Sequence, residues 1–307
     1  MTLTELKYIV AVARERHFGR AAEACFVSQP TLSVAVKKLE DELDVKLFER
    51  GAAEVNVTPL GEQIVRQAQQ VIEQAAAIKE IAKLGKDPVS GPLRLGVIYT
   101  IGPYLLPDLV RQAIQRVPQM PLMLQENFTA KLLDMLRLGE LDCAILAEPF
   151  PDTGLAMAPL YDEPFLAAVP ASHPMAKRKS VTAEQLKSEA MLLLGTGHCF
   201  RDHVLEVCPE YARFGSNVEG IRKSFEGSSL ETIKYMVASG MGVTVVPRLS
   251  VPAEKQPYIR YVKFSSPVPT RRVVLVWRRT FPRYEAIAAL RNCIYACALP
   301  GVKRVTG

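Results

Sequence analysis

Apolar residues at the start of the chain recur at the three- and four-residue spacing of amphipathic helices. This pattern predicts one helix from Leu3 to about Arg16, with Thr2 or Thr4 as its cap, and a second helix over 17–25. The turn FVSQ follows, and the apolar spacing then resumes. Two short helices, a tight turn and a third helix are therefore expected at the N-terminus.

The third predicted helix has two distinct faces. Ser28 is a suitable cap and Pro30 suits the first turn. Its apolar stripe consists of Leu32, Val36, Leu39 and Leu43. Gln29, Ser33 and Lys37 recur every four residues on another face, which is the polar and basic face of a helix-turn-helix that reads DNA bases and phosphates. A three-helix cap with a solvated outer face fits the same pattern.

A longer apolar pattern runs through 59–84 in alternating steps of four and three, which is typical of a coiled-coil seam. The seam consists of Ile64, Ala68, Val71, Ala75, Ile78 and Ala82. A helix packed on its own domain shows a similar stripe, but the segment is otherwise polar, which favours self-association. The segment GKDPVSGP, 85–92, then reads as a hinge.

Beyond the hinge, short apolar strands alternate with amphipathic helices, which predicts an α/β fold with a parallel sheet. The predicted strands are 92–99, 120–126, 141–147, 242–247 and 271–279, and the predicted helices are 105–117, 130–138, 229–239 and 283–299. The domains expected from these patterns are 1–58, a linker over 59–90, and a larger domain over 91–307.

Charge does not by itself indicate DNA binding. In residues 1–90, 12 Lys and Arg face 13 Asp and Glu, a net charge of −1; in 91–307, 26 face 19, a net charge of +7. No stretch reaches the roughly 18 consecutive apolar residues of a membrane helix, and the N-terminus lacks a secretory pattern. We therefore expect a cytoplasmic protein with no membrane association.

The stretch HFGRAAEACFVSQPTLSVAVKKLEDELDVKLFERGAAEVNVTPLGE resembles the winged helix-turn-helix of LysR-type transcriptional regulators. The resemblance implies that LFER and VNVT form the wing and that promoter DNA is the partner. The DNA-binding residues that it implies are Arg20, Ser28, Gln29, Pro30, Thr31, Ser33, Lys37 and Arg50. The wing tip, GAAE, lacks the basic residues common in the family, so weaker wing contacts are expected.

The same resemblance implies that the larger domain is a two-lobed effector domain similar to periplasmic binding proteins. Lobe I would hold about 92–162 and 268–307, and lobe II about 163–267. Family members bind a small effector between the lobes. A homotetramer, built as a dimer of dimers, and recruitment of RNA polymerase are implied as well.

Six cysteines divide into two groups. Cys25, Cys143, Cys293 and Cys297 lie in apolar patterns and are expected to pack as core thiols. Cys199 and Cys208 lie in the polar segment GTGHCFRDHVLEVCP. A helix N-terminus together with His198 and Arg201 predicts a lowered pKa for the Cys199 thiol.

Two readings of this segment compete. His198, Cys199, His203 and Cys208 offer nitrogen and sulfur ligands, but their spacing matches no usual zinc module. A disulfide requires Cα atoms within about 7 Å, whereas nine helical steps separate them by roughly 13 Å. If Cys199 and Cys208 pair, the helix between them must break, so oxidation changes the conformation.

The segments YTIGPYLLP, NFT, GHCFRDHVLEVCP and SSLET resemble the peroxide-sensing members of the LysR-type family. The resemblance implies that hydrogen peroxide oxidises Cys199, the peroxidatic thiol, and that Cys208 resolves it to a disulfide. It also implies that Thr100, Thr129 and His198 bind peroxide and that Arg271 or Arg272 supports the thiolate. His203 matches nothing in that pattern.

The expected protein is thus a regulator of oxidative-stress genes rather than an enzyme, without a metal or cofactor. A glutaredoxin or thioredoxin-type reductant would reset it. Three alternatives compete with this hypothesis: a LysR-type regulator that answers an ordinary metabolite, a thiol peroxidase, and a periplasmic solute receptor. The N-terminal helix-turn-helix pattern argues against the last two.

Overall fold

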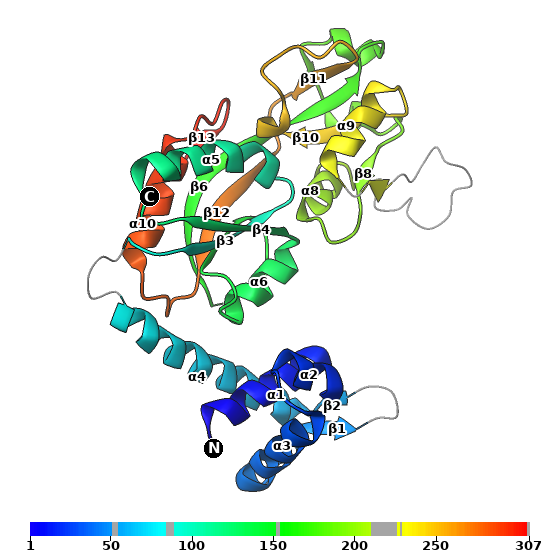
Figure 1. Ribbon diagram of the computed structural model, residues 1–307. Helices are drawn as coiled ribbons and strands as arrows, with labels where there is room; N and C mark the ends of the chain where they lie inside the picture. Colours follow the sequence, from blue (N-terminus) through cyan, green and yellow to red (C-terminus); the bar gives the residue numbers. More distant parts are fainter. Residues whose placement is uncertain (51–54, 84–88, 152–153, 210–225, 228, 306–307) are drawn as a thin grey trace. The chain divides into compact units, whose positions relative to one another are not determined.

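The chain forms two compact units, Met1–Lys86 and Asp87–Gly307 (Figure 1). The computed structural model describes residues 1–50, 55–83, 89–151, 154–209, 226–227 and 229–305. The predicted wing tip, most of the predicted hinge and the chain after residue 209 up to 225 lie outside the described residues.

The first unit contains the predicted helix-turn-helix. Its elements are α1 (Leu3–Glu15), α2 (Phe18–Ala24), α3 (Gln29–Leu43), β1 (Phe48–Arg50), β2 (Val55–Val57) and α4 (Pro59–Lys83). Thr2 caps α1 in a capping box with Glu5, and the Ser28 hydroxyl accepts from the Thr31 amide at the start of α3. The wing strands β1 and β2 pair antiparallel. The three helices and the wing predicted from the sequence are confirmed.

Part of the apolar stripe of α4 packs into the core of the first unit. Ala68 is buried in the core of the first unit, and Ile64 packs against the same core. Val71 and Ile78 are exposed, further along the helix. Packing within the first unit, the alternative to a coiled-coil seam, therefore accounts for the start of the stripe but not for Val71 and Ile78.

The second unit is built on a mixed sheet. Its strands are β3 (Leu93–Ile98), β4 (Leu122–Asn127), β5 (Cys143–Ala147), β6 (Ala156–Pro170), β7 (Ser180–Val181), β10 (Thr244–Pro247), β11 (Ile259–Phe264), β12 (Thr270–Trp277) and β13 (Lys303–Arg304). The order is β4-β3-β5-β12-β6-β11-β7, and β10 and β13 also pair with β6. Strand β3 is parallel to β4 and β5, but β12 is antiparallel to both β5 and β6.

The predicted parallel sheet is therefore confirmed for β3, β4 and β5 and wrong for the part of the sheet around β6 and β12. The reason is β6, a long strand that the hydrophobic pattern did not reveal and that pairs antiparallel with β10, β11 and β12. It contains prolines and the charged pair Asp162 and Glu163, which interrupt the apolar run by which a strand is identified.

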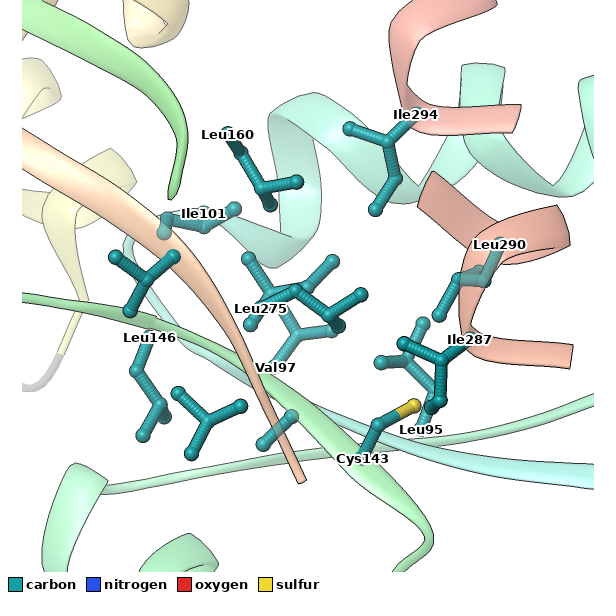
Figure 2. Packing of buried hydrophobic residues seen from close by; sticks show 14 of the residues in the cluster. Leu95, Val97, Ile101, Cys143, Leu146, Leu160, Leu275, Ile287, Leu290 and Ile294 are labelled. Atoms are coloured by element: carbon teal, nitrogen blue, oxygen red, sulfur yellow. The ribbon is translucent and has the colours of Figure 1, made fainter. Parts of the chain in front are cut away.

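Two hydrophobic cores lie on either side of the middle of β6. We call lobe I the part around the core that includes Leu95, Tyr161 and Leu275, and lobe II the part around the core that includes Phe165 and Val245. Figure 2 shows lobe I, where the side chains of α10 pack onto those of the central strands. The α10 side chains labelled there are Ile287, Leu290 and Ile294, and the strand side chains include Leu95, Val97 and Leu275.

Helices and short strands complete the lobes. Lobe I carries α5 (Gly102–Arg116), α6 (Thr129–Arg137) and α10 (Tyr284–Ala296). Lobe II carries η1 (Pro174–Lys177), α7 (Ala183–Leu186), β8 (Leu193–Leu194), α8 (Cys199–Val207), β9 (Glu226–Gly227), α9 (Leu230–Ala238) and η3 (Arg248–Ser250). In the described part of the chain, no helix combines the length and apolar character needed to cross a bilayer.

Candidate functional site

Helix α8 carries one cysteine at each end. Cys199 is its first residue and Cys208 its C-cap, and both are free thiols. Cys199 is half-buried and contacts the core of lobe I, whereas Cys208 is fully buried in the core of lobe II. Regular helix between them separates the Cα atoms by roughly 13 Å, so they cannot bond while α8 is intact.

The predicted peroxide-site residues converge on one very small cavity. Thr100, Thr129, His198 and Cys199 all line it, together with the backbone-rich turns at Gly197 and Asn127 and neighbouring apolar groups. Its volume is about 10 Å³, which is close to what a single water-sized molecule occupies. The structure thus brings together four residues from three separate segments around a space for one small polar molecule.

Thr100 is oriented by a buried ion pair. Arg271 donates from Nη1 to Thr100 Oγ1 at 2.8 Å and from Nη2 to the Thr100 carbonyl at 2.9 Å. Its Nε donates to Glu163 Oε2 at 2.9 Å, and both charged side chains are 1% exposed. Because the Thr100 oxygen already accepts from Arg271, its own O–H is left to donate toward the cavity.

The choice between Arg271 and Arg272 is decided by these contacts. Arg272 is exposed and pairs with Asp162, whereas Arg271 is buried and its charge lowers the pKa of Cys199. The Arg271 guanidinium also lies over the Phe200 ring, 5.1 Å from its centroid. Glu163 completes this arrangement, and it could not be identified from the sequence because a Glu between an Asp and a Pro gives no sign of burial.

The predicted low pKa of Cys199 is wrong. Burial raises the pKa of this thiol and outweighs the Thr129 hydroxyl and the Arg271 charge, which both lower it. The Arg201 guanidinium, expected near the sulfur, instead donates to the Leu194 carbonyl at 2.9 Å. Thr129 Oγ1 is buried, and Thr129 lines the cavity. Its hydroxyl lies close enough to the Cys199 sulfur to lower the pKa of that thiol.

Aromatic side chains close the small cavity. His198 is buried and packs edge-on against Phe128, with 4.8 Å between ring centroids, and it also contacts Tyr99. Beyond these rings lies a larger cavity of about 640 Å³, which Thr100, His198, Tyr99 and Glu126 help to line. The rings thus separate a water-sized space at the sulfur from a wider space open to larger molecules.

The four residues weighed as a metal site do not converge. His203 Nε2 lies 2.7 Å from the Glu148 carbonyl oxygen, and Cys208 is enclosed by the lobe II core, at the other end of α8 from His198 and Cys199. The described residues contain no group of three or more metal-ligating side chains. Cys143, Cys293 and Cys297 are buried, and burial raises the pKa of each thiol, as core packing predicts.

The predicted DNA-contacting residues of the first unit lie on or beside the start of α3. Gln29, Pro30, Thr31 and Lys37 are exposed, and Ser33 is half-buried. Ser28 is exposed as well, but its hydroxyl is used to cap α3. Arg20, on α2, is exposed and donates to the Glu15 carbonyl at 2.8 Å. Arg50 is the last residue of β1, and its side chain lies outside the described residues.

One exposed residue of α3 was missed by the sequence analysis. Val34 is 69% exposed, because it falls off the apolar stripe that Leu32 and Val36 contribute to the core. Helical spacing puts it on the same exposed face as Pro30, Thr31 and Lys37.

Two family models match nearly the whole chain. Residues 3–62 match the bacterial regulatory helix-turn-helix of the LysR family, and residues 86–297 match the LysR substrate binding domain. The chain is 41% identical over 292 residues to the "Hydrogen peroxide-inducible genes activator" of Pectobacterium carotovorum subsp. carotovorum, a match that covers 94% of this chain and 95% of the relative.

Solved structures of OxyR proteins are also similar to this chain. Full-length OxyR from Pseudomonas aeruginosa is similar with a TM-score of 0.74 and 52% identity, covering 97% of this chain and 99% of that one. An OxyR from Corynebacterium glutamicum in its H2O2-bound form is similar with a TM-score of 0.62 and 32% identity, covering 96% and 93%.

Proposed function

The chain belongs to the LysR family of bacterial regulators, and within it to the OxyR group, and from this premise we propose that it is a peroxide-sensing transcription regulator switched by a Cys199–Cys208 disulfide. Its family is one of DNA-binding regulators rather than enzymes. The observation that carries the proposal is the water-sized cavity in which Cys199 meets the hydroxyls of Thr100 and Thr129.

The first step oxidises Cys199 to a sulfenic acid. The sulfur attacks one peroxide oxygen, an S–O bond forms as the O–O bond breaks, and the second oxygen leaves as hydroxide, which takes a proton to become water. Thr100 donates a hydrogen bond to the peroxide, and Thr129 and His198 orient it. Arg271 favours the negative charge on the sulfur. Because burial raises the thiol pKa, only a small thiolate fraction reacts at neutral pH.

The second step forms the disulfide and requires α8 to unwind. The Cys208 thiolate attacks the Cys199 sulfur, the S–S bond forms, and the S–O bond breaks with release of a second water. Two thiols and one peroxide thus give one disulfide and two waters. Since α8 holds the cysteines roughly 13 Å apart, part of lobe II refolds. A glutaredoxin or thioredoxin-type dithiol reverses the reaction by exchange.

The DNA-binding half of the proposal rests on α3. Gln29 would bond a base edge, Thr31 and Ser33 would contact bases or phosphates, and Lys37 would neutralise the DNA backbone. Their exposure on α3, partial for Ser33, supports these roles. Exposed Val34 adds an apolar contact suited to a thymine methyl. The remaining predicted residues, Arg20, Ser28, Pro30 and Arg50, would position the helix and wing on the phosphates.

Self-association of the chain would couple peroxide sensing to DNA binding. The exposed Val71 and Ile78 of α4 would pair with a second chain, and two such dimers would form the tetramer. Refolding of lobe II would then alter how the DNA-binding units are spaced on the promoter and whether RNA polymerase is recruited. A cytoplasmic location suits a regulator that meets DNA and a dithiol reductant.

DNA footprinting with and without peroxide tests the proposal. Wild-type protein should change its protected bases after stoichiometric peroxide, and mass spectrometry should find the Cys199–Cys208 linkage. Cys199→Ser should bind DNA but keep one footprint, with Cys25→Ser as a control that still responds. A metabolite-responsive regulator would show no linkage, and a peroxide-dependent footprint in Cys199→Ser would refute the proposed switch.

A further inference from the structure

His203 is a buried titratable side chain on α8 that the peroxide chemistry does not use. It is 4% exposed and lies on the same helix face as Phe200 and Val204, which pack into the lobe II core. It does not line the cavity at Cys199. A polar ring in an apolar stripe needs a partner, and the identity of that partner suggests its role.

The partner of His203 is the backbone of lobe I. Nε2 lies 2.7 Å from the carbonyl oxygen of Glu148, the residue that follows β5. Since a carbonyl only accepts, Nε2 carries the proton and donates it. The Glu148 amide in turn donates to the Arg272 carbonyl on β12 at 2.9 Å. The hydrogen bond therefore connects the middle of a lobe II helix to the lobe I sheet.

The surroundings of the other ring nitrogen, Nδ1, favour one protonation state of the imidazole. Nδ1 is buried and has no hydrogen-bond partner among the described residues. A second proton there would find no acceptor, so the ring is seated as the neutral Nε2–H form. The rings of Phe165 and Phe200, with centroids 6.0 Å and 6.2 Å away, enclose it.

We propose that His203 is a positioning residue that fastens α8 to lobe I in the reduced protein and so sets the rate at which Cys208 reaches Cys199. The proposal rests on the proposed function. His203 lies four residues after one cysteine and five before the other, so unwinding α8 at His203 requires the ring to leave the Glu148 carbonyl. The hydrogen bond is present before the first oxidation and is broken before the disulfide forms.

A pair of isosteric substitutions isolates the hydrogen bond. His203→Gln keeps a side-chain N–H donor, and His203→Met has nearly the same length without it. Full-length reduced proteins are mixed with peroxide and quenched over time with a sulfenic acid trap and a thiol-alkylating agent, and mass spectrometry then gives separate rates for sulfenic acid and disulfide formation. His173→Met, at a lobe II histidine outside α8, is the control for replacing a histidine.

The expected result is a selective effect on the second step. His203→Met should form the disulfide roughly three to ten times faster than His203→Gln, the range set by one lost neutral hydrogen bond. Sulfenic acid formation should be equal in the two variants, and amide exchange in the reduced state should be faster across α8 but not α9 in His203→Met. His173→Met should match wild type.

Two failures are distinguishable. If wild-type protein forms no Cys199–Cys208 disulfide, the proposed function fails. If it does, but His203→Met resolves no faster than His203→Gln, or both steps change together, the positioning role of His203 is refuted while the switch stands.

Discussion

The DNA-reading face of α3 and the cavity at Cys199 are both small groups of polar side chains, but they are built in opposite ways. The face of α3 comes from one exposed helix, and Gln29, Thr31 and Lys37 lie within three turns of each other. The cavity draws Thr100, Thr129 and Cys199 from three segments that surround a space of about 10 Å³. A mutation on the face should therefore act locally, whereas one in the cavity should act on chemistry and folding together.

The largest expected effect comes from Cys208→Ser, which distinguishes the roles of the two cysteines. Cys208→Ser should still react with one equivalent of peroxide at Cys199, because the cavity is intact, but should form no disulfide. Trapping with a sulfenic acid reagent and mass spectrometry would detect a stable adduct at Cys199 in Cys208→Ser and little in wild type. Disulfide formation by Cys208→Ser, through any other cysteine, would contradict the assignment of Cys208.

On the exposed face, Gln29→Ala should weaken operator binding by roughly tenfold to a hundredfold, since one bidentate base contact contributes about 1–3 kcal/mol. Fluorescence anisotropy at fixed salt measures the binding. Gln115→Ala, at an exposed glutamine of α5 in the second unit, is the matched control and should bind as wild type. Peroxide should oxidise Cys199 at the same rate in both variants, and a slower oxidation in Gln29→Ala would break the contrast between the two regions.

In the buried site, Arg271→Lys should impair both reactivity and stability. A lysine keeps the charge but cannot donate to Thr100 and Glu163 at once, so oxidation of Cys199 should slow by about tenfold and the free energy of unfolding should fall by about 1–3 kcal/mol. Stopped-flow oxidation and urea denaturation measure the two effects. Arg272→Lys, at the exposed neighbour that pairs with Asp162, should change neither by more than about twofold or 0.5 kcal/mol.

The smallest expected effect is on pH dependence. Burial lowers the pKa of His203 below its usual 6.5 and outweighs the hydrogen bond to the Glu148 carbonyl, which raises it. The Arg271 charge lowers the pKa further, while Glu206 and Asp202 raise it. Released from α8 packing, the ring regains its usual pKa and binds a proton more readily. The stability of the seated helix is therefore present above about pH 6.5 and is lost as pH falls below it.

Amide hydrogen exchange across α8 in the reduced protein, without peroxide, measures whether α8 becomes less stable as pH falls. After correction for intrinsic rates, opening should be several times more frequent at pH 5.5 than at pH 7.5. His203→Gln, which has no titrating ring, should lose that dependence. If wild type and His203→Gln show the same pH dependence, a group other than His203 causes it.

Much of the first unit could be predicted because its signals are local. Helix α3 begins where Ser28 and Pro30 indicated, and its core stripe follows the helical period. In the second unit the same method found β3, β4, β5 and the helices between them but missed β6. That strand is stabilised by partners far along the chain, since the buried Glu163 pairs with Arg271 of β12 and accepts from the Leu249 amide.

The sequence alone determined the helix-turn-helix, the alternation of strands and helices, and the distance problem between Cys199 and Cys208, because each depends on spacing along one segment. Only the tertiary structure decided that burial raises the Cys199 pKa, that Arg271 rather than Arg272 is buried against Thr100, and that His203 donates to the Glu148 carbonyl. Desolvation and hydrogen bonding depend on which distant residues pack together, and no local pattern encodes that.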